Sequence, residues 1–260
     1  MSGLFLSDLH LFSGRSVGQS HWEQQRSAVS QASVIVLGGD IFDIRWSRLG
    51  SFRKTLKAAE RWLEEAIRLN PKASWVYLLG NHDCHPAIQE LLQTLSERHE
   101  GFTWNPSVWQ VGTSLFLHGD ILDAERHPLG LPGYREAFHE ETPRGPVGNL
   151  LYSAVIQSRI HGVVPRLRHT RRRTCDRLID YLKQECGDSF SSVRQVYFGH
   201  THIPMSGFQH AGIEFHNAGS GIRHLKFRPA RFDAVPQPLD LSMLTPSPPP
   251  DTAGPSDHSG

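Results

Sequence analysis

The chain has 260 residues, of which 38% are hydrophobic, and a formal net charge of +1 at neutral pH. This size and apolar content are enough for one large α/β domain, and the near-neutral charge excludes a surface that binds polyanions over its whole extent. Three cysteines without a CxxC spacing, no signal-peptide pattern and no apolar run of about 20 residues predict a cytoplasmic protein, either free or peripheral to the inner face of the membrane.

The first 120 residues alternate strand-like and helix-like patterns, which is typical of an α/β domain. Residues 52–69 and 87–98 have the apolar spacing of amphipathic helices. The tail at 236–260 is rich in Pro, Ser, Asp and Gly, and we expect it to be disordered after a single domain at 1–235. Apolar runs that predict strands occur at 4–6, 34–37, 75–79, 115–117 and 196–198.

The interval at about 121–192 is too long for a simple strand connection, and its apolar spacing predicts a helical insertion. Because the insertion lies between two motifs that follow strands, we expect it to form a cap over a site at the strand ends. One apolar stripe consists of Leu150, Leu151, Ala154, Val155 and Ile160, and a second of Cys175, Leu178, Ile179 and Leu182.

A basic run accompanies the second stripe and has three interpretations. It can be a solvated helix face, a phosphate-binding surface, or a surface that docks onto anionic lipid headgroups. The last two are compatible if the substrate is a phosphorylated lipid. The run comprises Arg166, Arg168, His169, Arg171, Arg172, Arg173 and Arg177.

Five short polar motifs each follow one of the predicted strands. A single motif of this kind is more often turn chemistry than a metal ligand. However, the carboxyl ends of strands in an α/β sheet lie at one edge, so all five should converge there. The motifs are Asp8-Leu9-His10, Gly38-Gly39-Asp40, Gly80-Asn81-His82-Asp83, His118-Gly119-Asp120 and Gly199-His200-Thr201-His202.

These residue types suit a two-metal site. Two divalent ions about 3.5–4 Å apart can clamp the attacking and leaving oxygens of a phosphoryl transfer and acidify a bound water. Imidazole and oxygen ligands favour Mn²⁺, Fe or Zn²⁺ over Ca²⁺, and the absence of thiolates argues against a structural zinc. We predict Asp40 as the bridge, with Asp8, His10 and His202 at one ion and Asn81, His118 and His200 at the other.

The residues beside these ligands have predicted supporting roles. His82 is the candidate that stabilises the phosphoryl group or protonates the leaving oxygen, because imidazole titrates near neutral pH. Asp83 either orients His82 or caps the following helix. Asp120 is expected to support the site or cap a helix rather than bind metal, and Asp43 has no assigned role.

Together the five motifs resemble those of calcineurin-like metallophosphoesterases. The resemblance implies an α/β fold with a central two-sheet β-sandwich flanked by helices, here with the helical cap insertion. It also implies a hydrolase that cleaves a phosphomonoester, phosphodiester or pyrophosphate bond with two divalent ions, for which Mn²⁺ is the favoured metal. The match includes Asp8, His10, Asp40, Asn81, His82, His118, His200 and His202.

Two alternatives remain. Some proteins of this fold lose ligands and act as interaction scaffolds, but every expected ligand and His82 are present here, which favours an enzyme. A cyclic-nucleotide or nucleic-acid phosphodiesterase is the other alternative. The near-neutral charge and the lack of aromatic residues among the basic ones argue against nucleic acid.

The insertion is similar to that of UDP-2,3-diacylglucosamine pyrophosphatases, which bind a two-chain glycolipid under a cap. Residues 133–138 resemble the segment that enters this cap. The resemblance implies a glycolipid substrate, peripheral membrane contact through the cap, and substrate binding by Tyr134, Arg135, Arg171 and Arg172. That subgroup usually carries Arg where this chain has His82, so a different phosphorylated small molecule remains an alternative substrate.

Overall fold

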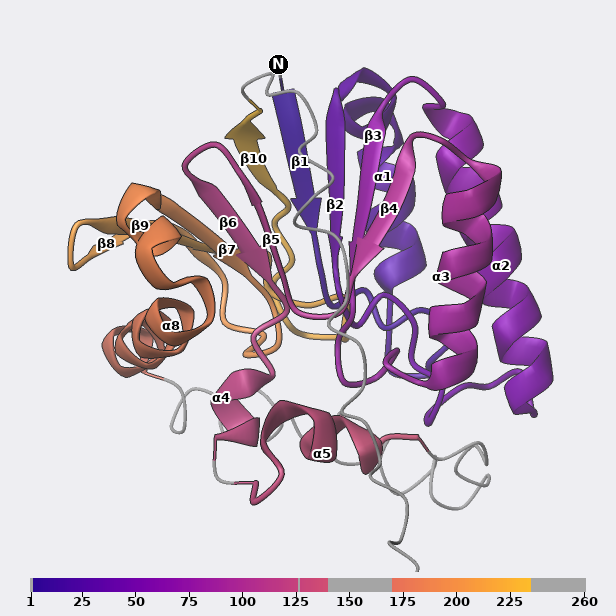
Figure 1. The fold of residues 1–260 in the computed structure, drawn as a ribbon. Coiled ribbons are helices and arrows are strands. Elements are labelled where there is room, and N and C mark those ends of the chain that lie inside the picture. Colours follow the sequence, from indigo (N-terminus) through magenta and orange to yellow (C-terminus); the bar gives the residue numbers. More distant parts are fainter. Residues whose placement is uncertain (1, 126, 140–169, 235–260) are drawn as a thin grey trace, which may run out of the picture.

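Two sheets of five strands each form the centre of the chain in a computed structural model that describes residues 2–125, 127–139 and 170–234 (Figure 1). In the first sheet, β1 to β4 are parallel and β10 pairs antiparallel with β1. This sheet has the order β10 (Ala230–Asp233), β1 (Ser2–Leu6), β2 (Val34–Gly38), β3 (Ser74–Leu78) and β4 (Phe102–Asn105).

The second sheet has three parallel strands at its centre and an antiparallel strand at each edge. Its order is β5 (Val108–Val111), β6 (Ser114–Leu117), β7 (Gln195–Phe198), β9 (Ile213–Asn217) and β8 (Met205–His210). The five predicted apolar runs coincide with β1, β2, β3, β6 and β7. The observed two-sheet arrangement confirms the predicted fold class.

The sheets pack against each other through alternate residues of their strands, as the two-residue period of a strand requires. Phe5 and Val36 of the first sheet share one buried cluster with Phe116 and Tyr197 of the second. The Phe116 and Tyr197 rings stack with centroids 4.8 Å apart, and Phe5 lies 5.9 Å from each of them. The intervening strand residues face outward into helices.

Three helices cover the outer face of the first sheet: α1 (Gly18–Gln31), α2 (Phe52–Leu69) and α3 (Pro86–Arg98) (Figure 1). The Ser51 side chain accepts a hydrogen bond from the Lys54 amide and fixes the start of α2. Pro86 occupies the first turn of α3, where its missing N–H is not needed. Both helices agree with the predicted ranges to within one residue.

The second apolar stripe of the predicted insertion forms a helix, but this helix does not lie where we expected it. The helix α8 (Arg171–Cys186) buries the predicted stripe against β6, β7 and β9, so it flanks the second sheet instead of capping the site. A short 3-10 turn, η2 (Gly187–Ser192), leads from α8 to β7. The short helices α4 (Ile121–Ala124) and α5 (Gly130–Glu136) lie beyond the carboxyl ends of the central strands (Figure 1).

Several predictions concern residues outside the described ranges. These are the stripe that includes Leu150 and Ile160, the basic residues Arg166, Arg168 and His169, and the tail from residue 236. Among the described helices, none is both long enough and apolar enough to cross a bilayer.

Candidate metal centre

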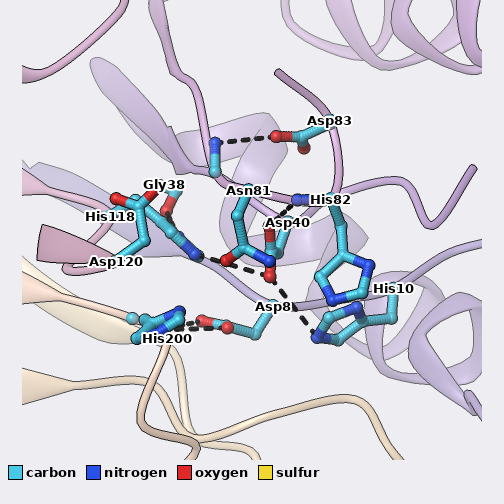
Figure 2. Close-up of polar contacts among 12 residues, drawn as sticks. Asp8, His10, Gly38, Asp40, Asn81, His82, Asp83, His118, Asp120 and His200 are labelled. Atoms are coloured by element: carbon cyan, nitrogen blue, oxygen red, sulfur yellow. Dashed lines mark hydrogen bonds and ion pairs between the residues drawn. The ribbon is translucent and has the colours of Figure 1, made fainter. Parts of the chain in front are cut away.

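The loops after β1, β2, β3, β6 and β7 bring all five polar motifs to one place (Figure 2). The first two loops run side by side, since the Asp8 amide donates to the Gly39 carbonyl at 3.0 Å and the His10 amide to the Asp40 carbonyl at 2.9 Å. The Gly199 amide donates to the His118 carbonyl at 2.8 Å and joins the two loops of the second sheet. The site therefore spans both sheets.

The candidate ligand atoms lie in overlapping groups. Asp40 is shared, because its Oδ2 lies 3.4 Å from His118 Nε2 and 3.9 Å from His10 Nε2. This position between two groups is the one expected of a bridging carboxylate. Three sets have all their ligand atoms within 4.8 Å of one another: Asp8, His10 and His202; His10, Asp40 and His82; and Asp40, His118 and His200.

Most of the candidate ligands have a strained backbone. Five of the eight non-glycine residues with positive φ in the described chain are candidate ligands: Asp8 at 53°, His10 at 48°, Asp40 at 52°, His200 at 62° and His202 at 56°. The left-handed region is sparsely populated by non-glycine residues, and such strain concentrates at functional sites. The fold therefore maintains these side-chain directions at a cost to stability.

Two glycines allow the carboxylates to approach the neighbouring backbone. A Cβ on Gly80 would lie 2.2 Å from Asp40 Oδ1, and one on Gly199 would lie 2.2 Å from Asp8 Oδ2. Since real Cβ contacts are not this short, any larger residue would displace these carboxylates. The glycines of the third and fifth motifs thus have a steric function.

Buried polar atoms without hydrogen-bond partners indicate that these residues fit metal ions. Asn81 Oδ1 and His118 Nε2 are buried and have no hydrogen bond among the described residues. Such atoms are rare in proteins and require an explanation such as an ion. His118 Nδ1 lies 2.9 Å from the Gly38 carbonyl oxygen, which fixes the ring so that Nε2 faces Asp40.

The electrostatics of the centre favour cations. Burial opposes ionisation of Asp40, but the adjacent His118 and His82 outweigh it and hold the pKa of its carboxyl well below the usual range. Burial also opposes protonation of His118, yet Asp40 raises the pKa of that imidazole to about 10. Burial lowers the pKa of His10 and keeps it in the neutral form that binds metals. The ionised Asp40 carboxylate therefore favours a cation beside it, and a metal bound by His118 would take the place of that ring's proton.

Asp43 orients the candidate catalytic histidine. Its Oδ1 lies 3.1 Å from His82 Nδ1, and its Oδ2 pairs with the Arg15 guanidinium at 2.9 Å. The same Oδ2 lies 3.7 Å from His10 Nδ1, so one buried carboxylate contacts both a candidate ligand and His82. Sequence reasoning left Asp43 without a role, although its place three residues after Asp40 in the same loop was an available signal.

Neither predicted role of Asp83 agrees with its contacts. Its carboxylate accepts hydrogen bonds from the Ile41 amide at 2.8 Å, the Tyr77 hydroxyl at 2.6 Å and the Gly80 amide at 2.7 Å. The N-cap of α3 is His85, whose Nδ1 accepts from the Ala87 amide at 3.1 Å. Asp83 therefore braces the third motif against the second, and Asp43 makes the contact with His82 expected of Asp83.

Arg135 is engaged within the protein, in contrast to its predicted role in substrate binding. Its Nε and Nη2 donate to the two carboxylate oxygens of Asp120 at 2.6 and 3.0 Å. The guanidinium also donates to the carbonyls of Leu79 at 2.8 Å and Pro106 at 2.5 Å. Asp120 thus holds the α5 segment through this buried ion pair, and its support of the site remains a prediction.

The other predicted substrate residues remain predictions. The Tyr134 ring packs against Phe138 with centroids 5.3 Å apart, and Arg171 lies 5.9 Å above the Phe208 ring. Arg172 is exposed on α8. The segment after α5 does reach the centre, because the Phe138 ring lies 5.6 Å from that of His82.

Asp123 of α4 is a supporting residue that the sequence did not reveal. Its Oδ2 lies 3.1 Å from His200 Nε2, so a metal held by His200 would bind to the other ring nitrogen, Nδ1. Carboxylates that bond to the remote nitrogen of a ligating histidine fix the ring orientation and increase its basicity. The pairing depends on how α4 lies beside the fifth motif.

Asp123→Ala is therefore expected to weaken binding of one metal ion by about 10- to 100-fold, because His200 loses its orienting partner. Calorimetric titration of the metal-free protein with Mn²⁺ measures the affinity directly. Glu125→Ala is the matched control, since Glu125 is an exposed acid two residues away that pairs with Arg177. Equal Mn²⁺ affinities in the two variants would show that Asp123 does not support a ligand.

Comparison with known proteins assigns the chain to a family. A family model described as calcineurin-like phosphoesterase matches residues 1–204. Among solved structures, the chain is similar to the crystal structure of a dimetal phosphatase from Danio rerio, with 13% identity, a TM-score of 0.43, and coverage of 85% of this chain and 88% of that chain. No curated protein matches the sequence. The family assignment rests on the model match, which covers most of the chain.

Proposed function

Because the chain belongs to the calcineurin-like phosphoesterase family and is a dinuclear-metal hydrolase, we propose that it cleaves phosphoester bonds with His82 as the proton donor to the leaving oxygen. Phosphodiesters are the first substrates to test, and Mn²⁺ is the proposed metal. The observation that carries the proposal is the position of Asp40 between two groups of inward-facing ligands.

Seven side chains would hold the two ions. Bound there, the ions would supply Lewis-acid stabilisation of the phosphoryl group and activation of the attacking water. Asp40 suits the shared position because its carboxylate has two oxygens and lies near histidines of both groups. Asp8, His10 and His202 would complete one ligand set, and Asn81, His118 and His200 the other.

His82 is positioned to donate a proton. Asp43 engages its Nδ1 at 3.1 Å, so Nε2 is the nitrogen available to a leaving oxygen. Burial disfavours the charged ring, but Asp43 and Asp40 outweigh it and raise the pKa of His82 above its ordinary value. A larger share of His82 is then protonated at neutral pH, as a general acid requires. The Phe138 ring contacts this ring edge to face, with centroids 5.6 Å apart.

The finer substrate proposals have unequal support. We also propose that the protein is cytoplasmic. A glycolipid substrate and peripheral contact with the membrane are proposals that rest on the insertion. The engagement of Arg135 with Asp120 removes one of the residues on which the glycolipid proposal was based. The presence of His82 favours the wider family's substrates.

A substrate panel with the metal-free protein tests the proposed function. We expect added Mn²⁺ to restore hydrolysis of bis-p-nitrophenyl phosphate, and Ca²⁺ to restore much less, because the ligands include several imidazoles. The panel also contains p-nitrophenyl phosphate, cyclic nucleotides and UDP-diacylglucosamine. Stoichiometric Mn²⁺ binding without hydrolysis of any of these esters would favour a metal-binding scaffold instead.

A further inference from the structure

A basic surface groove lies along the first half of α2, outside the metal centre. Its volume is about 680 Å³, and it is lined by Arg48, Leu49, Lys54, Lys57, Glu60 and Arg61. None of the four basic side chains pairs with a carboxylate of the described residues. Glu60 is the one acid among the lining residues. The Arg98 guanidinium lies 3.9 Å from its carboxylate and partly offsets that negative charge.

The charge pattern of the groove does not stabilise α2. Lys54 lies in the first turn, which contains no acidic residue, although the helix dipole disfavours cations there. Lys54, Lys57 and Arg61 follow one another at spacings of three and four residues, so like charges are neighbours on one helix face. Because these cations repel one another within the helix, an anion from outside would stabilise them.

One end of the groove lies next to the loops that carry the metal ligands. The Arg48 amide donates to the Phe12 carbonyl at 3.0 Å, and the Arg48 side chain lies against Gly14, where an added Cβ would meet Nε at 1.9 Å. Phe12 and Gly14 follow His10 in the first loop, and Arg48 follows Asp43 in the second. Since α2 begins at the carboxyl edge of β2, the groove and the metal centre share one end of the molecule (Figure 1).

The shape and chemistry of the groove fit a strand of phosphodiesters. The stripe from Lys54 to Arg61 extends about 10 Å along the helix axis, which is long enough to contact more than one phosphate. The groove also offers the methylene stems of its basic residues and Leu49, which is 36% exposed. An inorganic polyphosphate has no apolar atoms that could contact this surface, whereas the sugars and bases of an oligonucleotide do.

We propose that this groove binds the phosphate backbone of a single-stranded oligonucleotide whose scissile phosphodiester lies at the metal centre. The inference rests on the proposed function and names its substrate class. A net charge of +1 for the whole chain is compatible with it, because the basic residues of the groove are concentrated on one helix face. The groove is lined by no aromatic side chain, so the proposed contacts are with the phosphates and do not depend on stacked bases.

A binding measurement without catalysis tests the groove. Fluorescence anisotropy of labelled hexathymidylate is measured on the full chain in EDTA. We expect Lys54→Glu/Lys57→Glu to weaken binding by about tenfold or more and to reduce the slope of log affinity against log salt by about 1.4, because two phosphate contacts are lost. The control is Arg68→Glu/Lys72→Glu, which changes the same charge at the far end of α2 and in the turn that follows it, and should lose less than about twofold.

Three results would overturn the proposal: equal losses in the two double variants, equally tight binding of an uncharged methylphosphonate strand, or competition by tripolyphosphate as strong as by the strand. A melting temperature for each variant excludes unfolding as the cause. An assay of ester hydrolysis by the wild type distinguishes failure of this proposal from failure of the proposed function. If the wild type cleaves no ester but the groove variant still loses strand binding, the proposed function fails and the groove assignment stands.

Discussion

Asp40→Asn is expected to reduce phosphodiester turnover by about 10³-fold or more, because the carboxylate shared by the two ions loses its charge. The amide retains the size of the side chain and an oxygen that can still accept the His82 amide hydrogen bond, which is 2.8 Å long. The fold should therefore persist. Mass-spectrometric metal analysis and steady-state kinetics on the same preparation measure both consequences.

The metal content of this variant is as informative as its turnover. We expect fewer than two ions per chain, since Asp40 belongs to both ligand groups. Asp188→Asn is a suitable control, because Asp188 lies in η2 and outside the centre. Full turnover with two bound ions in the Asp40 variant would remove the bridging role.

His82→Ala is expected to lower kcat by about 10²- to 10⁴-fold while metal content stays unchanged, because the ring donates a proton and is not required as a ligand. The loss should be larger for esters with an alkoxide leaving group than for p-nitrophenyl esters. A p-nitrophenolate leaves without protonation, so a general acid contributes little to its departure. Kinetics with a matched pair of aryl and alkyl diesters measure this difference.

Controls for His82 separate proton donation from metal binding. His99→Ala removes a histidine that contacts Glu64 on the helical side of the first sheet, and it should leave kcat unchanged. Equal losses on aryl and alkyl esters would contradict proton donation, and a loss of metal in the His82 variant would assign the ring to metal binding instead. The second outcome is meaningful because His82 shares a ligand group with His10 and Asp40.

The convergence of the site could be predicted because a general rule of α/β sheets governs it. Each motif comes directly after a short apolar run, and parallel strands place the loops at their carboxyl ends along one edge. Asp8 and His200 are far apart in sequence, yet the His200 amide donates to both carboxylate oxygens of Asp8 at 3.0 and 3.1 Å. The apolar pattern of the strands and the chemistry of the ligand residues were sufficient to predict that the five motifs converge.

Supporting contacts could not be predicted, because they depend on side-chain directions that strand patterns do not encode. Asp43 and Asp83 are both acids next to a motif, and only the path of each loop decides which one meets His82. The pairing of Asp123 with His200 depends on the position of α4. Arg135 shows the same limit, since the chain pattern does not reveal that Asp120 engages it.

The stripe of α8 illustrates a further limit. Its apolar spacing indicates that one face is buried, and the structure confirms this for Cys175, Leu178 and Leu182. The spacing does not say which partner covers that face. Either a cap or the outer face of a sheet would give the same pattern, and the second is observed.

Anomalous X-ray diffraction from crystals of the protein grown with Mn²⁺ tests the central claim most directly. We expect two peaks about 3.5–4 Å apart, with Asp40 contacting both ions and the two groups of histidines on either side. A single peak, or two peaks of which Asp40 contacts only one, would contradict a dinuclear centre at these residues.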